Sequence, residues 1–245
     1  MPRNHDFVNA VAAVETKPKL NSAIATAFLQ DMAANLLLAA RYGAIAGYIA
    51  FAPAGSEEFF RGTVPSPIGL IDASLPNLGD CLLRTIEEIF VRGHTSAVIL
   101  NSDSPTLPTA LLVEAADALA FPGERVVLGP CTDGGYYLLG LKSPHRRLFD
   151  EITWSTERVA AQTLERAREL ELEVHVLPAW HDVDDAEGLR RLQHELRAAP
   201  AGERRLDPHT PHYPAATAAL MGSLPANELR GAMHETDPRI PIRSA

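Results

Sequence analysis

The fold is decided by one stretch of the chain, Ala97-Val98-Ile99-Leu100-Asn101-Ser102-Asp103-Ser104-Pro105-Thr106-Leu107-Pro108. Its four consecutive aliphatic residues, 97–100, predict a short strand that is buried on both faces. A turn rich in hydroxyl groups and proline follows, and a helix is expected to resume at Thr109. Asp103 would then lie at the carboxyl end of a central parallel strand, which is where open α/β sheets bind their ligands.

Two interpretations of Asp103 are open at the level of local sequence. A carboxylate that faces a crevice at this position suits a hard divalent cation, Mg²⁺ or Mn²⁺, that also binds phosphates. Alternatively, Asp103 forms an Asx turn that caps the following helix.

Strand-like and helix-like segments alternate on both sides of this stretch. Apolar spacing predicts helices over 21–41, 78–91, 111–119, 155–170 and 189–196. In the fourth of these, Ser155 is expected to be the N-cap, and Ser56 is expected to cap a short turn earlier in the chain. Further strands are predicted over 8–14, 45–51, 68–71, 125–128, 136–141 and 174–177. This alternation predicts an α/β fold, a three-layer α/β/α sandwich with a mainly parallel sheet.

Composition limits the class of protein. The chain has 245 residues, of which 46% are hydrophobic, and this is enough for one sizeable core. Its net charge of −9 argues against nucleic acid or an anionic membrane as a partner. The sequence shows neither a signal peptide nor a membrane span, so a cytoplasmic location is predicted. Cys81 and Cys131 have no metal-site spacing and are expected to be core or loop thiols.

The pattern changes after about residue 198, where prolines and histidines interrupt any periodicity. We therefore expect a folded domain over 1–198, with residues to about 222 able to pack back on it. The Pro/His-rich tail, 199–245, is expected to be largely mobile. Within it, Ala215–Met221 could form one or two helical turns.

A second loop follows the strand predicted over 125–128. Its Asp133-Gly134-Gly135 sequence allows left-handed backbone geometry and a close approach of main-chain N–H groups to a ligand. The alternative is a plain hairpin turn between two strands. Tyr136 and Tyr137 come next and point in opposite directions, so at most one of them faces a ligand.

A third loop, Trp180-His181-Asp182-Val183-Asp184-Asp185, follows the last predicted strand. One carboxylate, Asp185 or its neighbour, is enough to cap the next helix. Additional carboxylates repel one another unless a cation or a basic group faces them. Asp103 with Asp182 or Asp184 could therefore hold Mg²⁺ or Mn²⁺, which would bridge a nucleotide diphosphate.

These motifs resemble those of a bacterial family of GT-A-like glycosyltransferases, of the arsenosugar-biosynthesis and nucleotide-diphospho-sugar transferase type. The resemblance extends from about residue 22 to 197 and rests on 100–108, 128–141, Trp154-Ser155-Thr156 and Asp182-Val183-Asp184-Asp185. It implies a nucleotide-binding α/β/α sandwich similar to the 2-phospholactate and molybdenum-cofactor guanylyltransferases.

The resemblance also implies roles for particular residues. Asp103 would be catalytic and would bind the metal and the donor diphosphate, and Asp182 or Asp184 would complete the metal shell. Asp133 would be the second catalytic carboxylate. The residues expected to contact substrate are Ser102, Ser104, Thr132, Gly134, Gly135, Tyr136, Lys17 and Lys19.

One segment departs from the pattern of the family. Members carry a basic loop of the kind Lys-x-Pro-x-x-Gly-x-x-Lys-Thr-Arg-Leu, whereas this chain has Ala13-Val14-Glu15-Thr16-Lys17-Pro18-Lys19-Leu20-Asn21. The glycine and the arginine are gone. Lys17 and Lys19 either replace them as point charges or are two exposed lysines beside a turn proline.

The leading hypothesis is a metal-dependent glycosyltransferase that takes a nucleotide-sugar donor and a small-molecule acceptor. One alternative is a nucleotidyltransferase of the guanylyltransferase type, and another is a catalytically silent nucleotide-binding relative. A homo-oligomer is left open.

Overall fold

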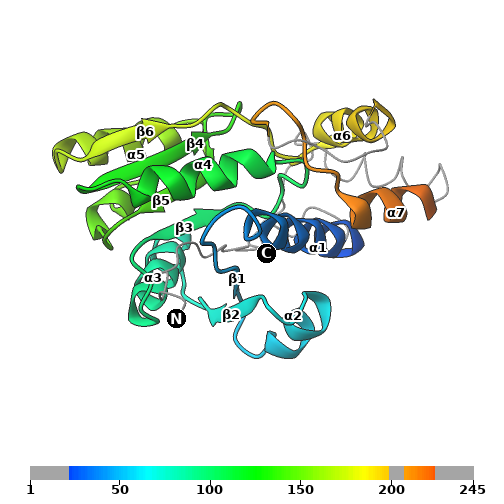
Figure 1. The fold of residues 1–245 in the computed structure, drawn as a ribbon, viewed down its shortest axis with the longest axis horizontal. Helices are drawn as coiled ribbons and strands as arrows, with labels where there is room; N and C mark the ends of the chain where they lie inside the picture. Colours follow the sequence, from blue (N-terminus) through cyan, green and yellow to red (C-terminus); the bar gives the residue numbers. More distant parts are fainter. Residues whose placement is uncertain (1–21, 199–206, 224–245) are drawn as a thin grey trace, which may run out of the picture.

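The deciding stretch forms strand β3 (Ala97–Leu100), and all four of its residues are buried, as the composition predicts. In a computed structural model of the protein, which describes residues 22–198 and 207–223, β3 belongs to a four-stranded sheet. The strand order is β3-β5-β4-β6, with β4 (Arg125–Pro130), β5 (Tyr136–Leu141) and β6 (Glu173–Val176). Two further strands, β1 (Tyr48–Phe51) and β2 (Gly69–Asp72), form a separate parallel pair (Figure 1).

The four-stranded sheet is mixed, with three strands in one direction and one reversed, and β3 is not a central parallel strand. β3, β4 and β6 run in one direction, while β5 is antiparallel to both β3 and β4. Within 22–198 and 207–223, β3 is hydrogen-bonded to β5 alone and lies at the edge of this sheet. The cause is the turn over 131–135, which reverses the chain after β4. It directs β5 between β3 and β4, and both of these strands run opposite to β5. The hairpin interpretation of Asp133-Gly134-Gly135 is therefore correct.

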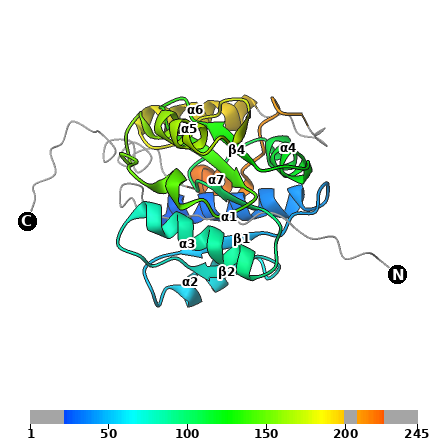
Figure 2. The same ribbon diagram turned by 90° about the vertical axis from the view of Figure 1, so that its left-hand side faces the viewer.

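Helices cover both faces of the sheet, which confirms the three-layer α/β/α arrangement. On one face, Val98 and Leu100 pack with helices α1 (Ser22–Ala39) and α4 (Thr109–Ala120). On the other face, Ala97 and Ile99 pack with α3 (Leu78–Val91), the 3₁₀ helix η1 (Arg146–Phe149) and α5 (Val159–Glu169). Figure 2 shows α3 and α5 on one side of β4 and α4 on the other. Alternate residues of β3 thus contribute to two separate cores.

Of the predicted helix caps, Ser155 is wrong, Ser56 has the expected position only, and Asp185 is correct. Ser155 has a left-handed backbone with φ 62°, and α5 begins only at Val159. The delay has a local cause, because the Thr156 hydroxyl donates to the Thr153 carbonyl and closes an extra turn first. Ser56 is the N-cap residue of α2 (Glu57–Thr63), as predicted, but its side chain makes no capping hydrogen bond. Asp185 does cap α6 (Ala186–Ala198), since its Oδ1 accepts from the amides of Glu187 and Gly188.

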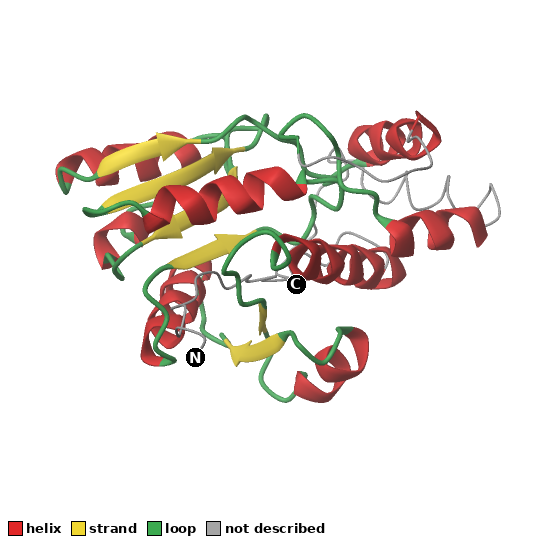
Figure 3. Ribbon diagram, in the orientation of Figure 1, coloured by secondary structure: helices red, strands yellow, loops and turns green. Residues whose placement is uncertain are grey.

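The segment expected to form a helical turn or two is helix α7 (Ala215–Ser223), which lies against α1 (Figure 3). Asp31 of α1 is buried and accepts hydrogen bonds from the Ala216 amide (2.8 Å), the Thr217 amide (2.9 Å) and the Thr217 hydroxyl (2.5 Å). Burial raises the pKa of Asp31 above its ordinary value, although these hydrogen bonds oppose the shift.

Some expectations concern residues outside the described ranges. The strand predicted over 8–14 and the two lysines Lys17 and Lys19 lie there, as do 199–206 and 224–245. In the part of the chain that the structure describes, no helix combines the length and apolar character needed to cross a membrane.

The end of β4 depends on a close backbone approach at Gly129. A Cβ atom there would lie 2.3 to 2.7 Å from atoms of the Tyr137 ring and hydroxyl. Tyr137 is fully buried, and its hydroxyl donates to the Pro178 carbonyl at 2.9 Å. The ring therefore cannot move aside without losing a buried hydrogen bond.

We expect Gly129→Ala to lower the free energy of unfolding by about 1–3 kcal/mol, because overpacking a filled core forces side chains and backbone to shift. Urea denaturation measures the change. Gly62→Ala is the matched control, since a Cβ at this exposed helical position meets nothing within 4 Å. Its effect should stay within about 1 kcal/mol and favour the folded state. Equal losses in the two variants would contradict the packing argument.

Candidate functional site

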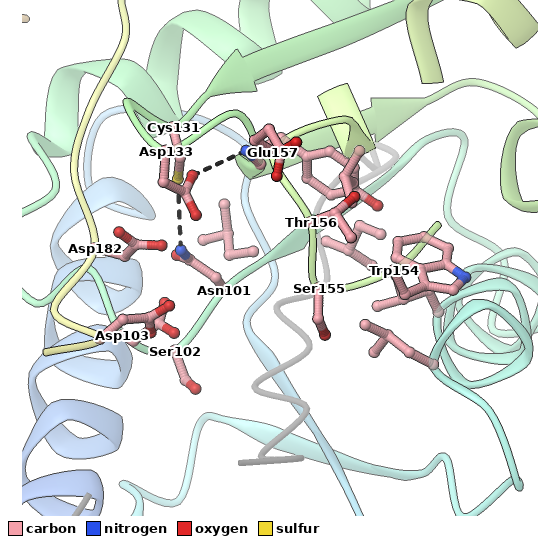
Figure 4. A pocket seen from close by; sticks show the side chains of 18 residues that line it. Asn101, Ser102, Asp103, Cys131, Asp133, Trp154, Ser155, Thr156, Glu157 and Asp182 are labelled. Atoms are coloured by element: carbon pink, nitrogen blue, oxygen red, sulfur yellow. Dashed lines mark hydrogen bonds between the residues drawn. The ribbon is translucent and has the colours of Figure 1, made fainter. Parts of the chain in front are cut away.

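The loops that follow β3, β4 and β6 meet at a cavity of about 350 Å³. The segment before α5 and the first turns of α3 complete its wall. Figure 4 shows Asp103, Asp182 and Asp133 on one side of this cavity and Trp154 on the opposite side. Three segments that are far apart in the sequence therefore contribute to one site, as expected at the ends of strands.

Asp103, Asp182 and Asp184 form a compact group of carboxylates. Each offers one oxygen, and these oxygens all lie within 4.8 Å of one another. The helix after the first loop, α4, has Pro108 at its N-cap, so Asp103 does not cap it. The carboxylate of Asp103 lines the cavity.

Main-chain hydrogen bonds hold the three loops together. The Val183 amide donates to the Asp103 carbonyl at 2.9 Å, and the Thr132 amide donates to the Trp180 carbonyl at 3.0 Å. The Ser104 hydroxyl adds a bond to the His181 carbonyl at 3.0 Å. Because these bonds involve the backbone next to the carboxylates, they set the positions from which the acidic side chains project.

The donor set of this group fits a hard divalent cation. Three carboxylates provide the oxygen ligands that Mg²⁺ and Mn²⁺ prefer, and a cation would relieve their mutual repulsion. A second group, Cys131, Asp133 and Asp182, is equally compact but chemically less suitable. Burial, followed by the charges of the nearby aspartates, raises the pKa of the Cys131 thiol, which therefore stays protonated and is a poor ligand.

The Asp133 loop is fixed against the segment before α5. Gly134 has φ 95°, and a Cβ atom there would lie 2.2 Å from the Glu157 carbonyl oxygen. The Gly134 carbonyl also accepts from the Ala160 amide at 3.0 Å. Asp133 is exposed, and its Oδ1 accepts from the Gly135 amide at 2.9 Å. Only glycine permits the close contact between residue 134 and the Glu157 backbone, and this contact fixes the loop against the segment before α5.

The other residues that the sequence analysis selected occupy different places. Ser102, Gly135 and Tyr136 line the cavity, and burial raises the pKa of the Tyr136 phenol, which therefore stays neutral. Ser104 is fully buried, with its hydroxyl bonded to the His181 carbonyl, and does not line the cavity. Gly134 and Thr132 also lie outside the lining.

Sequence reasoning missed the opposite wall of the cavity. We name this wall the apolar wing and define it as Leu78, Leu82, Ile99, Tyr136 and Trp154. Of these residues, the sequence analysis selected Tyr136 alone as a candidate for contact with a ligand. The one signal was Trp154-Ser155-Thr156, which supports the resemblance but does not reveal that Trp154 faces a cavity.

Comparison with known proteins gives a family model and several similar structures. Residues 36–156 match the model of DUF2064, described as an uncharacterized protein conserved in bacteria. The comparison with curated proteins gives no match.

Similar folds occur among transferases. The chain is similar to a putative nucleotide-diphospho-sugar transferase from Desulfovibrio desulfuricans G20, with a TM-score of 0.71 and 24% identity over 95% of this chain and 98% of that one. It is similar to a cytidylyltransferase from Leptospira borgpetersenii, with a TM-score of 0.56 and 11% identity over 94% and 97% of the two chains. It is also similar to CMP:2-keto-3-deoxy-manno-octonic acid synthetase complexed with CTP, with a TM-score of 0.51 and 13% identity over 79% of this chain and 99% of that one. At these identities the comparisons show a shared α/β fold.

We expect Gly134→Ala to lower the free energy of unfolding by about 3 kcal/mol, because it combines an unfavourable φ with a collision against the Glu157 backbone. Gly55→Ala separates these two causes, since Gly55 also has φ 90° but a Cβ there meets nothing within 4 Å. Gly55→Ala should lower the free energy of unfolding by about 1 kcal/mol, because only the unfavourable positive φ acts at this position. Urea denaturation measures both, and equal losses would show that the approach to Glu157 contributes nothing.

Proposed function

We propose that the protein is a metal-dependent glycosyltransferase that transfers a sugar from a nucleotide-activated donor to a small-molecule acceptor. The observation that supports it best is the group of Asp103, Asp182 and Asp184, whose carboxylates come within 4.8 Å of one another in the same cavity as Asp133. The family resemblance and the shared fold are consistent with this reaction, but the proposal depends on the carboxylates.

The proposed division of labour follows from position. Asp103, Asp182 and Asp184 would hold Mg²⁺ or Mn²⁺ at the end of the cavity that binds the donor diphosphate. When bound, such a cation neutralises diphosphate charge and makes the nucleoside diphosphate a better leaving group. The backbone bonds of Val183 and Thr132 keep the carboxylates in place without relying on flexible side chains.

Asp133 would act on the sugar or on the acceptor. Its carboxylate is exposed to the cavity and oriented by the Gly135 amide, which leaves further lone pairs for a substrate. In this role it accepts the proton of the acceptor hydroxyl or stabilises positive charge that develops on the transferred glycosyl carbon.

Nucleotidyl transfer is the competing reaction on this fold. It joins a nucleoside monophosphate to a phosphorylated acceptor and releases pyrophosphate, whereas glycosyl transfer releases a nucleoside diphosphate. The leaving group therefore distinguishes the two activities.

We expect Asp103→Asn to weaken Mn²⁺ binding about tenfold or more, because it removes one of three charged oxygen ligands. Isothermal titration calorimetry with Mn²⁺ alone measures this. Asp117→Asn is the control, since Asp117 is an exposed aspartate of α4 away from the cavity. Unchanged Mn²⁺ affinity in Asp103→Asn would remove the proposed metal role of Asp103.

We expect the protein with Mn²⁺ to release a nucleoside diphosphate from a UDP- or GDP-sugar, as measured by chromatography of the products. Asp133→Asn should lower kcat about 100-fold, the usual size of a lost acid–base contribution. Its Mn²⁺ affinity should change less than about threefold, because the three metal-binding carboxylates remain. Release of pyrophosphate from a nucleoside triphosphate, with no reaction of the nucleotide-sugars, would show that the protein catalyses nucleotidyl transfer and would contradict glycosyl transfer.

A further inference from the structure

The apolar wing is a built surface contributed by four separate segments. Leu78 and Leu82 come from α3, Ile99 from β3, Tyr136 from β5 and Trp154 from the segment before α5. Leu82 and Ile99 belong to the core cluster on that face of the sheet, and Leu78, Tyr136 and Trp154 pack against it. The wing is thus an extension of the core that opens into the cavity rather than a set of isolated exposed side chains.

Trp154 is held in place from behind. A Cβ atom at Gly79 would lie 3.1 Å from the indole Nε1 and 3.2 Å from a carbon of the indole ring. The indole therefore packs directly on the backbone of the first turn of α3, which begins behind the Asn77 cap. An aromatic side chain supported in this way presents a rigid flat surface to a ligand at low entropic cost.

The charge of the cavity restricts what can lie on that surface. The lining includes five carboxylates, those of Asp103, Asp133, Glu157, Asp182 and Asp184. A divalent cation offsets only part of this charge, and the diphosphate of a nucleotide-sugar adds more negative charge. A second anion in the same cavity would be repelled, whereas a neutral or cationic molecule would not.

We propose, resting on the glycosyltransferase function above, that the apolar wing binds the acceptor. The acceptor class is a hydroxyl compound with a flat apolar face and no negative charge. Its hydroxyl oxygen attacks the anomeric carbon while the bond from that carbon to the donor phosphate oxygen breaks. The electron pair of the broken bond leaves with the nucleoside diphosphate, and the hydroxyl proton passes to Asp133. The products are a glycoside and a nucleoside diphosphate.

Tryptophan emission tests this assignment directly. The chain has two tryptophans, Trp154 in the wing and Trp180, which stacks on His181 outside the cavity. In a Trp180→Phe variant, all of the tryptophan emission comes from Trp154, so a change in emission reports on the wing. We would titrate 2-phenylethanol, 2-phenylethylammonium and 2-phenylethyl phosphate in the presence of Mn²⁺ and UDP. The alcohol and the ammonium ion should change Trp154 emission saturably, and the phosphate ester should bind about tenfold more weakly or worse.

Two variants separate apolar contact from charge. Leu82→Ala in the same background should weaken 2-phenylethanol binding about fivefold, because it removes apolar contact area from the wing. Phe59→Ala, an exposed aromatic of α2, is the control and should leave binding unchanged. Glu157→Gln removes one carboxylate without changing the wing, so it should strengthen phosphate ester binding several-fold and leave the alcohol unchanged.

The outcomes distinguish this inference from the function on which it rests. If Mn²⁺ and nucleotide-sugars bind and react but 2-phenylethanol does not affect Trp154, the wing is not the acceptor site and the glycosyltransferase proposal stands. Phosphate ester binding as tight as that of the alcohol overturns the stated acceptor class. If the alcohol binds but no nucleotide-sugar reacts, the acceptor role falls together with the proposed function.

Discussion

The arrangement of the carboxylates depends on a backbone contact between two loops, in which the Val183 amide donates to the Asp103 carbonyl at 2.9 Å. It joins the loop after β3 to the loop after β6, which lie at opposite edges of the four-stranded sheet. Because it connects main-chain atoms, it sets the spacing of Asp103 from Asp182 and Asp184 whether or not their side chains are charged. Mutual repulsion of the carboxylates opposes this arrangement, and the loop contacts around it must outweigh that repulsion.

Much of the architecture could be predicted from local sequence. Four aliphatic residues at 97–100 predict a strand buried on both faces, and the structure has that strand. The position of β5 could not be predicted in this way, because which strands pair is decided by contacts far apart in sequence. The Asp133-Gly134-Gly135 sequence permits a hairpin and a ligand loop equally, and the structure shows the hairpin, with Asp133 in the lining of the cavity.

The sequence predicts the acidic side of the cavity but not the apolar wing. Carboxylates that follow strands are visible as motifs, so the amino-acid sequence alone is enough to select Asp103 and Asp182. Trp154 could not be placed, because its direction depends on the left-handed Ser155 and on an extra turn that delays α5. A helical pattern of apolar residues indicates neither feature. Ser104 shows the opposite error, since a hydroxyl beside a selected aspartate need not face the ligand.

The contact between Asp31 and Thr217 has a consequence for how the chain is completed during synthesis. The two residues are 186 positions apart, so the first described helix carries a buried carboxylate whose amide and hydroxyl partners are translated after every strand of the sheet. Until then, α1 has neither those donors nor the apolar cover that Met221 adds over Ile24 and Phe28. The strands can therefore pair before this corner is complete, and until Thr217 and Met221 emerge from the ribosome the unpaired face of α1 is open to chaperones.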